Sequence, residues 1–182
     1  MYMRRAMFLI FLFFIMLQIF CSCNWEGNIA ILDSDRRVAQ TVNEEFLNAV
    51  QEKDKEHLKS MFSKNALDQV KSFDDSVEML FNYCNGKVVD YDDGGGPFVE
   101  TTKNENRIYQ VMESSFTVEM DLCEYRFAMQ FVTKGEDNEI GVTSIYVIKA
   151  SDDLDLNHAY WGDGLFEPGI HVAVPNKIDS TQ

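Results

Sequence analysis

The spacing of apolar residues changes once along this chain, at about Gly86, and no other feature constrains the fold as strongly. Before Gly86, apolar residues recur every three or four positions, which is the spacing of one helix face. After it, apolar and polar residues alternate, which is the pattern of a half-buried strand. Helices followed by strands, without a repeated strand–helix–strand order, indicate an α+β fold in which N-terminal helices pack on a curved antiparallel sheet.

The segment before Gly86 predicts helices separated by short breaks. A first helix has Ser34 as its candidate N-cap, and a second, shorter helix has Asp54 in the same role. One or two further helical turns surround Ala66. Gly86 is the candidate C-cap of the last helix, whose apolar stripe consists of Val77, Leu80, Phe81 and Cys84.

Strands are predicted after Gly86 as an antiparallel meander. Ser114 and Ser115, within the longest strand, are candidates for a bulge. The segment 140–150 is apolar on both faces, as expected of a central strand that is covered on both sides. The predicted strands cover residues 87–91, 108–120, 123–131, 140–150 and 170–174.

The N-terminal segment has the pattern of a secretory signal. Arg4 and Arg5 precede an apolar run from Met7 to Phe20, interrupted only by Gln18. This run of 14 residues is short for a bilayer core, which takes about 20 helical residues, but it suits the apolar region of a signal peptide. The alternative is a tilted N-terminal anchor that is never cleaved.

The stretch FCSCNW, residues 20–25, resembles a bacterial lipobox, in which a small residue precedes an invariant cysteine. Cys23 fits this pattern with Ser22 before it, although Phe20 stands where leucine is usual. The resemblance implies that residues 1–22 are removed and that Cys23 becomes the lipidated N-terminus, on the extracytoplasmic face of the cell membrane. Residues 23–34 are then a tether.

The charge of the chain restricts the partners it can have. The formal net charge is −14, and removal of Arg4 and Arg5 with the signal makes the mature chain more acidic still. Such a surface argues against nucleic acid and against adsorption to anionic lipid, so a macromolecular partner is expected to be basic. The simpler interpretation, that the acidic residues only keep a secreted domain soluble, stays open.

The predicted helices and strands together resemble the NTF2-like, cystatin-like cone found in a family of uncharacterised bacterial lipoproteins. The resemblance is carried by the helix pair FLNAVQEKDKEHLKSMFS, the strands SFTVEMDLCEYRFAMQF and GVTSIYVIKA, and the closing PGIHV. It implies a single domain over residues 35–176, followed by a C-terminal tail over 177–182. The family is one of unknown activity, so the resemblance implies a fold and no reaction.

Sites for metals, cofactors or covalent catalysis are not found in the sequence. The loop that starts at Asp153 begins like a calcium-binding EF-hand, but His158 and Gly164 stand where glycine and glutamate are required. No catalytic residue, metal site or cofactor is therefore expected. Cys84 and Cys123 either form one disulfide or remain two buried thiols.

The densest group of binding residues lies in the glycine-rich loop from His158 to His171. Trp161, Asp163, Glu167 and His171 suit a recognition rim, because loops tend to carry function. Tyr125 is the polar group expected on the inner face of the sheet. The alternative is that the aromatic residues of the loop only cover the open end of the cone.

Two classes of function follow from these observations. The first is a non-enzymatic, membrane-anchored binding module for a protein or small ligand, one version of which is an immunity-type inhibitor of a basic toxin. The second is an isomerase or dehydratase that uses a pocket tyrosine with His171 or Asp163. The enzyme requires these groups to converge in a small apolar cavity. The sheet also offers a candidate face for a homodimer.

Overall fold

The computed structural model describes residues 25–105, 107–152 and 166–173, with side chains from residue 33 onwards. The chain divides into two compact units, Met1–Ser34 and Asp35–Gln182. The second unit contains the sheet and most of the helical residues described below. None of the described helices is both long enough and apolar enough to cross a bilayer.

The helices precede the strands, as predicted. They are α2 (Trp25–Glu52), α3 (Lys55–Met61), α4 (Lys64–Gln69) and α5 (Phe73–Tyr83). The predicted cap at Asp54 is confirmed, because its carboxylate accepts a hydrogen bond from the backbone N–H of His57 at 2.9 Å. The predicted cap at Ser34 is wrong: α2 already begins at Trp25, and residues 25–33 contain no proline that would end a helix before Ser34.

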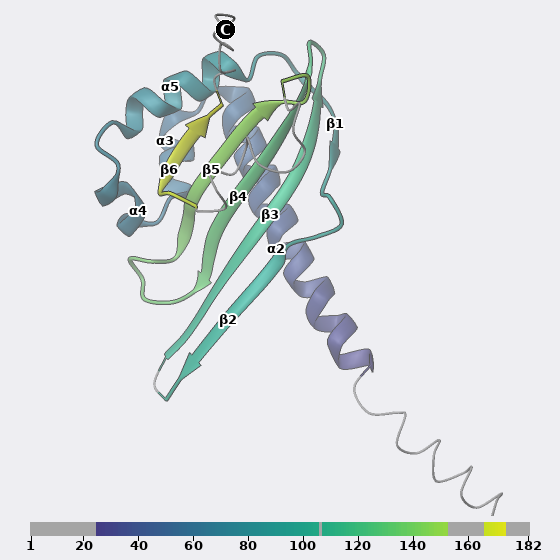
Figure 1. The fold of residues 1–182 in the computed structure, drawn as a ribbon, viewed down its shortest axis with the longest axis vertical. Coiled ribbons are helices and arrows are strands. Elements are labelled where there is room, and N and C mark those ends of the chain that lie inside the picture. Colours follow the sequence, from purple (N-terminus) through teal and green to yellow (C-terminus); the bar gives the residue numbers. More distant parts are fainter. Residues whose placement is uncertain (1–24, 106, 153–165, 174–182) are drawn as a thin grey trace, which may run out of the picture. The chain divides into compact units, whose positions relative to one another are not determined.

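The strands form one curved sheet that does not close on itself (Figure 1). Its order is β1-β3-β4-β5-β6, and β2 pairs with β3 on the same side as β1. The described pairs are antiparallel except β5 with β6, which is parallel, so the predicted meander is wrong at its end. A parallel pair needs a connection of a dozen or more residues, and 19 residues separate the end of β5 from the start of β6. The bounds are β1 Val88–Asp92, β2 Phe98–Asn104, β3 Arg107–Met120, β4 Glu124–Lys134, β5 Gly141–Lys149 and β6 Gly169–Val172.

Two details of the sheet differ from the sequence prediction. The strand β2 was not predicted, because almost all of its side chains are exposed and backbone pairing with β3 holds it without an apolar alternation. The predicted bulge at Ser114 and Ser115 is also wrong, since both residues are in regular register with β4 and the irregularity lies between Gln110 and Val111. Ser114 is instead a buried partner of Asn43, whose amide nitrogen donates to it at 2.8 Å.

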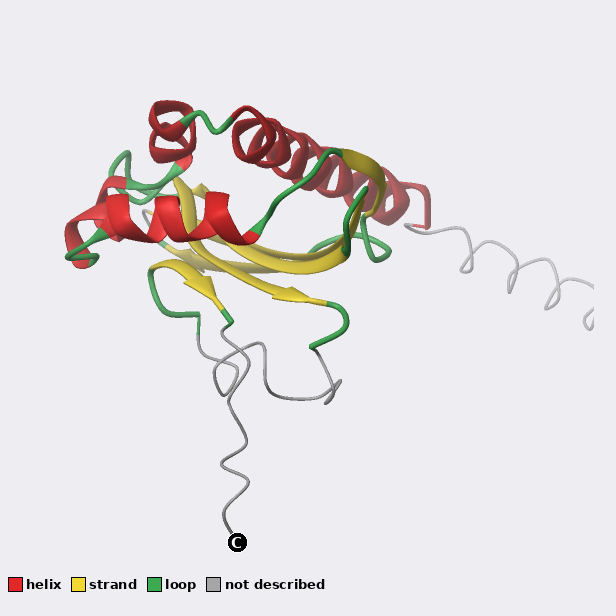
Figure 2. Cartoon of the chain, turned by 90° about the horizontal axis from the view of Figure 1, so that it is seen from above, coloured by secondary structure: helices red, strands yellow, loops and turns green. Residues whose placement is uncertain are grey.

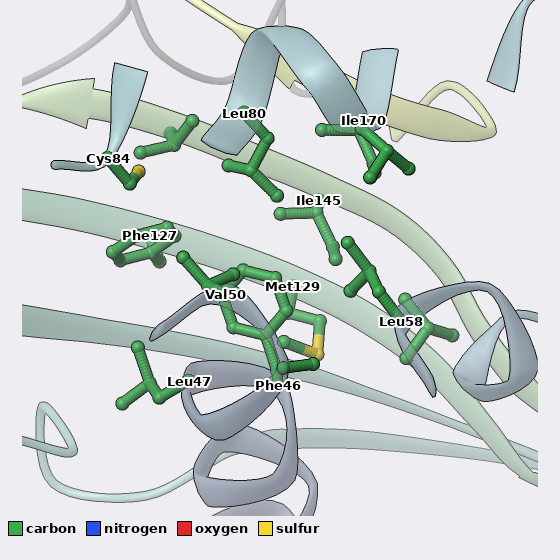
Figure 3. Close-up of a cluster of buried hydrophobic side chains, with 14 of the residues drawn as sticks. Phe46, Leu47, Val50, Leu58, Leu80, Cys84, Phe127, Met129, Ile145 and Ile170 are labelled. Carbon is green, nitrogen blue, oxygen red and sulfur yellow. The ribbon is translucent and has the colours of Figure 1, made fainter. Parts of the chain in front are cut away.

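The helical residues of the second unit, from Asp35 onwards, cover one face of the sheet, and an aromatic cluster fills the space between the two layers (Figure 2). The ring of Phe46 on α2 meets Phe116 and Phe127 edge-on, with centroids 6.3 and 5.4 Å away. Phe116 and Phe127 are cross-strand partners whose rings stack at 5.1 Å. Figure 3 shows the surrounding core, which includes Leu47, Val50, Leu58, Leu80, Cys84, Met129, Ile145 and Ile170.

Cys84 and Cys123 are free thiols in this structure and do not form the disulfide that the sequence allowed. Cys84 is buried among the core residues, and Cys123 is partly buried and packs against the same core. Burial raises the pKa of the Cys84 thiol well above its usual value, and the neighbouring Cys123 raises it further. The buried thiol is therefore protonated and behaves as a small apolar residue.

An ion pair ties α2 to the break between β1 and β2. These two strands pair with opposite halves of β3, and Asp93 lies in the loop that separates them. Arg36 donates two hydrogen bonds of 2.8 Å to the Asp93 carboxylate, and Gln40 donates a third of 2.8 Å. The next residue, Gly94, has a φ of +63°, and an added Cβ there would lie 2.5 Å from the Ser115 carbonyl oxygen.

Replacement of Asp93 by asparagine tests this ion pair through its pH dependence. The Arg36 guanidinium lowers the pKa of Asp93 from its ordinary value to about 2. A depressed carboxyl pKa gives stability that is fully present above the unfolded-state pKa, roughly 3.9, and that is lost as the pH falls towards 2. At pH 6 the free energy of unfolding of the wild type should exceed that of Asp93→Asn by about 1 kcal/mol. This value is reduced for solvent screening because Arg36 is half-exposed.

The measurement is urea unfolding of both proteins at several pH values between 2 and 6. Asp137→Asn is the matched control, because Asp137 is an exposed aspartate that forms no ion pair within the described residues. A difference between wild type and Asp93→Asn that stayed constant down to pH 2 would show that the carboxylate charge does not provide the stability.

Candidate functional site

The strand register places the predicted site residues on two opposite faces of the sheet. Phe127 on β4 pairs with Val147 on β5, which pairs with Val172 on β6, and the first two belong to the helix-covered core. Tyr125 lies two residues from Phe127 and therefore shares its face. Tyr146 and His171 are each one residue out of phase with this set, so they lie on the face away from the helices.

Tyr125 is part of the core and is not available to a ligand at the surface. Its side chain is only 1% exposed. The hydroxyl donates to the Tyr83 carbonyl oxygen at 2.7 Å and accepts from the Asn85 backbone N–H at 3.3 Å. Burial raises the pKa of this hydroxyl, and its hydrogen bond with Cys123 adds to the increase. These contacts tie the end of α5 to β4, which is a structural role.

The face away from the helices carries an aromatic cluster centred on Tyr146. The Tyr146 ring stacks on the His171 imidazole, with centroids 4.4 Å apart and an angle of 20° between the planes. Phe166 meets the same ring edge-on at 5.8 Å. Tyr146 is buried despite its position on this face, and burial is the main cause that raises the pKa of its hydroxyl. Two residues of the predicted loop, Phe166 and His171, are thus held against β5.

The backbone of Glu167 is fixed by the same cluster. Its N–H donates to the Tyr146 hydroxyl at 2.9 Å. Its carbonyl oxygen accepts from the Ser144 hydroxyl, and from His171 Nε2 at 2.9 Å when that nitrogen carries the proton. The side chain of Glu167 remains exposed. We call Tyr146, Phe166, Glu167 and His171 the Tyr146 surface.

The structure therefore brings together two of the predicted binding residues and separates a third. Glu167 and His171 meet at the Tyr146 surface, and Tyr125 lies on the other face. Trp161 and Asp163 lie outside the described residues. Tyr146 was missed as a site residue because its strand is apolar on both faces, and only the pairing with β6 shows which aromatic residue meets the loop.

The side chains of the Tyr146 surface offer three kinds of contact to a ligand. An exposed carboxylate, an imidazole and packed aromatic rings can form ion pairs, hydrogen bonds and apolar contacts with a cationic group. Within the part of the chain that the structure describes, no group of three or more histidine, cysteine, aspartate or glutamate side chains is placed to hold a metal ion.

Comparison with known protein families identifies the family of this chain. Residues 45–150 match a domain of unknown function, DUF5104, which spans more than half of the sequence. The protein belongs to this family. The match covers α3, α4, α5 and the strands β1 to β5, and it ends before the segment that contains Glu167 and His171. A comparison with curated proteins finds no match.

Removal of the Tyr125 hydroxyl tests its assignment to the core. Tyr125→Phe leaves the Tyr83 carbonyl oxygen without its donor, so the free energy of unfolding should fall by about 1–3 kcal/mol. Tyr109→Phe is the matched control, because the Tyr109 hydroxyl forms no hydrogen bond within the described residues, and it should change stability by less than about 0.5 kcal/mol. Urea unfolding measures both values. Equal stabilities for the two variants would contradict a structural role for the Tyr125 hydroxyl.

Proposed function

We propose that the protein is a lipid-anchored binding module on the extracytoplasmic face of the membrane, with an NTF2-like cone as its folded domain. The observation that carries the proposal is the filled space between the helices and the sheet. An enzyme of the isomerase or dehydratase kind would hold its substrate there, and Phe46, Phe116 and Phe127 occupy that space with their side chains buried. Binding is therefore assigned to the outside of the domain.

The enzyme alternative is less well supported than the binding module. It needs a pocket tyrosine beside His171 or Asp163. Tyr125 is hydrogen-bonded inside the core, whereas His171 lies on the opposite face of the sheet, stacked on Tyr146. A proton cannot pass directly between groups that the sheet separates, because general acid–base catalysis requires hydrogen-bond distances.

The Tyr146 surface is the proposed contact for a basic partner. Its Glu167 carboxylate is exposed, while the backbone of that residue is held by Tyr146 and Ser144. A side chain on a fixed backbone loses little freedom on binding, which favours affinity. The negative net charge, −14 before Arg4 and Arg5 are removed with the signal, attracts a cationic protein or ligand from a distance. An immunity-type inhibitor of a basic toxin is one form of this function. The same face is also a candidate homodimer interface.

The proposed anchor rests on the sequence around Cys23. A diacylglyceryl group with two long chains would contribute on the order of 20 kcal/mol, at roughly 0.8 kcal/mol for each buried methylene, which holds a protein on the membrane. Cys23→Ser should therefore abolish labelling by an alkyne fatty acid fed to the native cells and release the protein from the membrane fraction. Cys21→Ser is the control and should leave labelling unchanged. Labelling that persists in Cys23→Ser would overturn the anchor.

A cross-linking experiment tests the proposed binding surface. Tagged full-length protein is cross-linked in the native cells, recovered from the membrane fraction and analysed by mass spectrometry. A basic partner should be recovered, and Glu167→Lys should reduce its yield at least tenfold, because the substitution replaces an attractive charge by a repulsive one.

Glu119→Lys is the matched control for this experiment, since it makes the same change at an exposed position on β3. Its partner yield should equal that of the wild type. Equal yields from the Glu167 and Glu119 variants, or no recovered partner, would contradict a protein-binding role for the Tyr146 surface.

A further inference from the structure

A second surface feature lies between the β2–β3 hairpin, the β4–β5 turn and α4, and its wall includes Pro168, the residue after Glu167. It consists of two adjoining hollows of about 270 and 160 Å³, which share Tyr109 and Glu139 in their walls. Each is smaller than a typical ligand pocket, roughly 300–1,000 Å³, so a ligand of that size has to span both. We call them the Tyr109 groove. None of Tyr146, Glu167 and His171 is in its walls, which include Thr102, Asn104, Arg107, Asn65, Gln69 and Thr143.

The walls of the groove are fixed to one another by polar contacts. Arg107, at the start of β3, binds both carboxylate oxygens of Glu139 in the β4–β5 turn. On the other side, Asn65 of α4 and Asn138 of the same turn exchange hydrogen bonds of 2.9 and 2.8 Å. The hairpin, the turn and α4 are thus held together without a ligand. A preformed groove binds more tightly than a flexible one, because less ordering is needed on binding.

The charged groups of the groove neutralise each other. The Arg107 guanidinium lowers the pKa of Glu139, and Glu139 in turn raises the pKa of Arg107, so both groups are charged at neutral pH. Glu139 binds Arg107 at hydrogen-bonding distance, and Glu136, which is not in the walls, lies 3.9 Å from the same guanidinium. The two charged groups within the walls therefore cancel, and the groove favours an uncharged ligand.

The remaining polar groups of the groove are uncharged, and several have no hydrogen-bond partner among the residues that the structure describes. The side chains of Thr102 and Asn104 and the hydroxyl of Tyr109 form no hydrogen bond within the described residues. Hydroxyl and amide groups both donate and accept, so together they match a ligand that carries several hydroxyls. Tyr109 also presents a half-buried ring with the Arg107 guanidinium 5.6 Å from its centroid. An aromatic ring supplies a flat apolar surface beside these polar groups.

These features select one class of ligand. A sugar ring has an apolar face of C–H groups, which can lie on an aromatic ring, and a rim of hydroxyls that need mixed donors and acceptors. A mainly apolar ligand would displace water from the Thr102 and Asn104 side chains without replacing its hydrogen bonds, at a cost in free energy. We propose that the Tyr109 groove binds a neutral oligosaccharide, with one sugar ring on Tyr109 and its hydroxyls on the amide and hydroxyl side chains around it.

Glycan binding at the Tyr109 groove does not require a basic partner at the Tyr146 surface, and one experiment can distinguish the two activities. Detergent-solubilised full-length protein is applied to an array of neutral and acidic oligosaccharides, and the affinity for each bound glycan is measured by calorimetry. Neutral glycans should bind. Tyr109→Ala should weaken their binding at least tenfold, whereas Tyr109→Phe, which keeps the ring and loses only one of the hydrogen-bonding groups, should weaken it by about threefold.

Asn104→Ala is a second variant at an exposed position, where folding is not at risk, and it should weaken the same glycans at least threefold. Glu167→Lys should bind them like the wild type, because Glu167 is not in the walls of the groove. The proposal is overturned if no neutral glycan binds, if acidic glycans are preferred, or if the bound glycans are unaffected by Tyr109→Ala and Asn104→Ala.

Discussion

The contact of Phe46 with Phe116 and Phe127 is the interaction on which the rest of the structure depends. One ring from α2 lies across two stacked rings from neighbouring strands, and the three side chains are almost fully buried. Burial of three aromatic side chains contributes several kcal/mol and fixes the position of the helix on the sheet. The same contact fills the space between the helices and the sheet, in which a ligand could otherwise bind.

A filled interior moves the candidate sites to the outside of the domain, where polar contacts at the edges of the sheet shape them. The Tyr146 surface exists because β6 runs parallel to β5 and places His171 beside Tyr146. The Tyr109 groove exists because Arg107 and Glu139 join the end of a hairpin to a turn between two other strands. In both cases a surface is positioned by pairing between segments that are distant in the sequence.

Much of the fold follows from the sequence, because burial on one side of an element leaves a periodic pattern. The stripe that includes Val77 and Leu80 predicts the buried face of α5, and the alternation from Tyr125 to Phe131 predicts the inner face of β4. The strand β2 leaves no such pattern, since backbone hydrogen bonds to β3 hold an almost fully exposed segment. The bulge was misplaced for a similar reason: Ser114 is buried by its hydrogen bond with Asn43, and serine gives no sign of that partner.

The sequence by itself determined the α+β class, the order of helices and strands, the inner face of the sheet and the acidity of the surface. These are local properties, set by the spacing and chemistry of neighbouring residues. Only the tertiary structure decided that Tyr125 and His171 lie on opposite faces, that Cys84 and Cys123 are free thiols, and that Tyr109 and Glu139 share a groove. The faces and the groove depend on which strands pair and in which direction, and the free thiols depend on how the end of α5 packs beside the start of β4. A sequence pattern with a period of two residues does not specify which strand will be its partner.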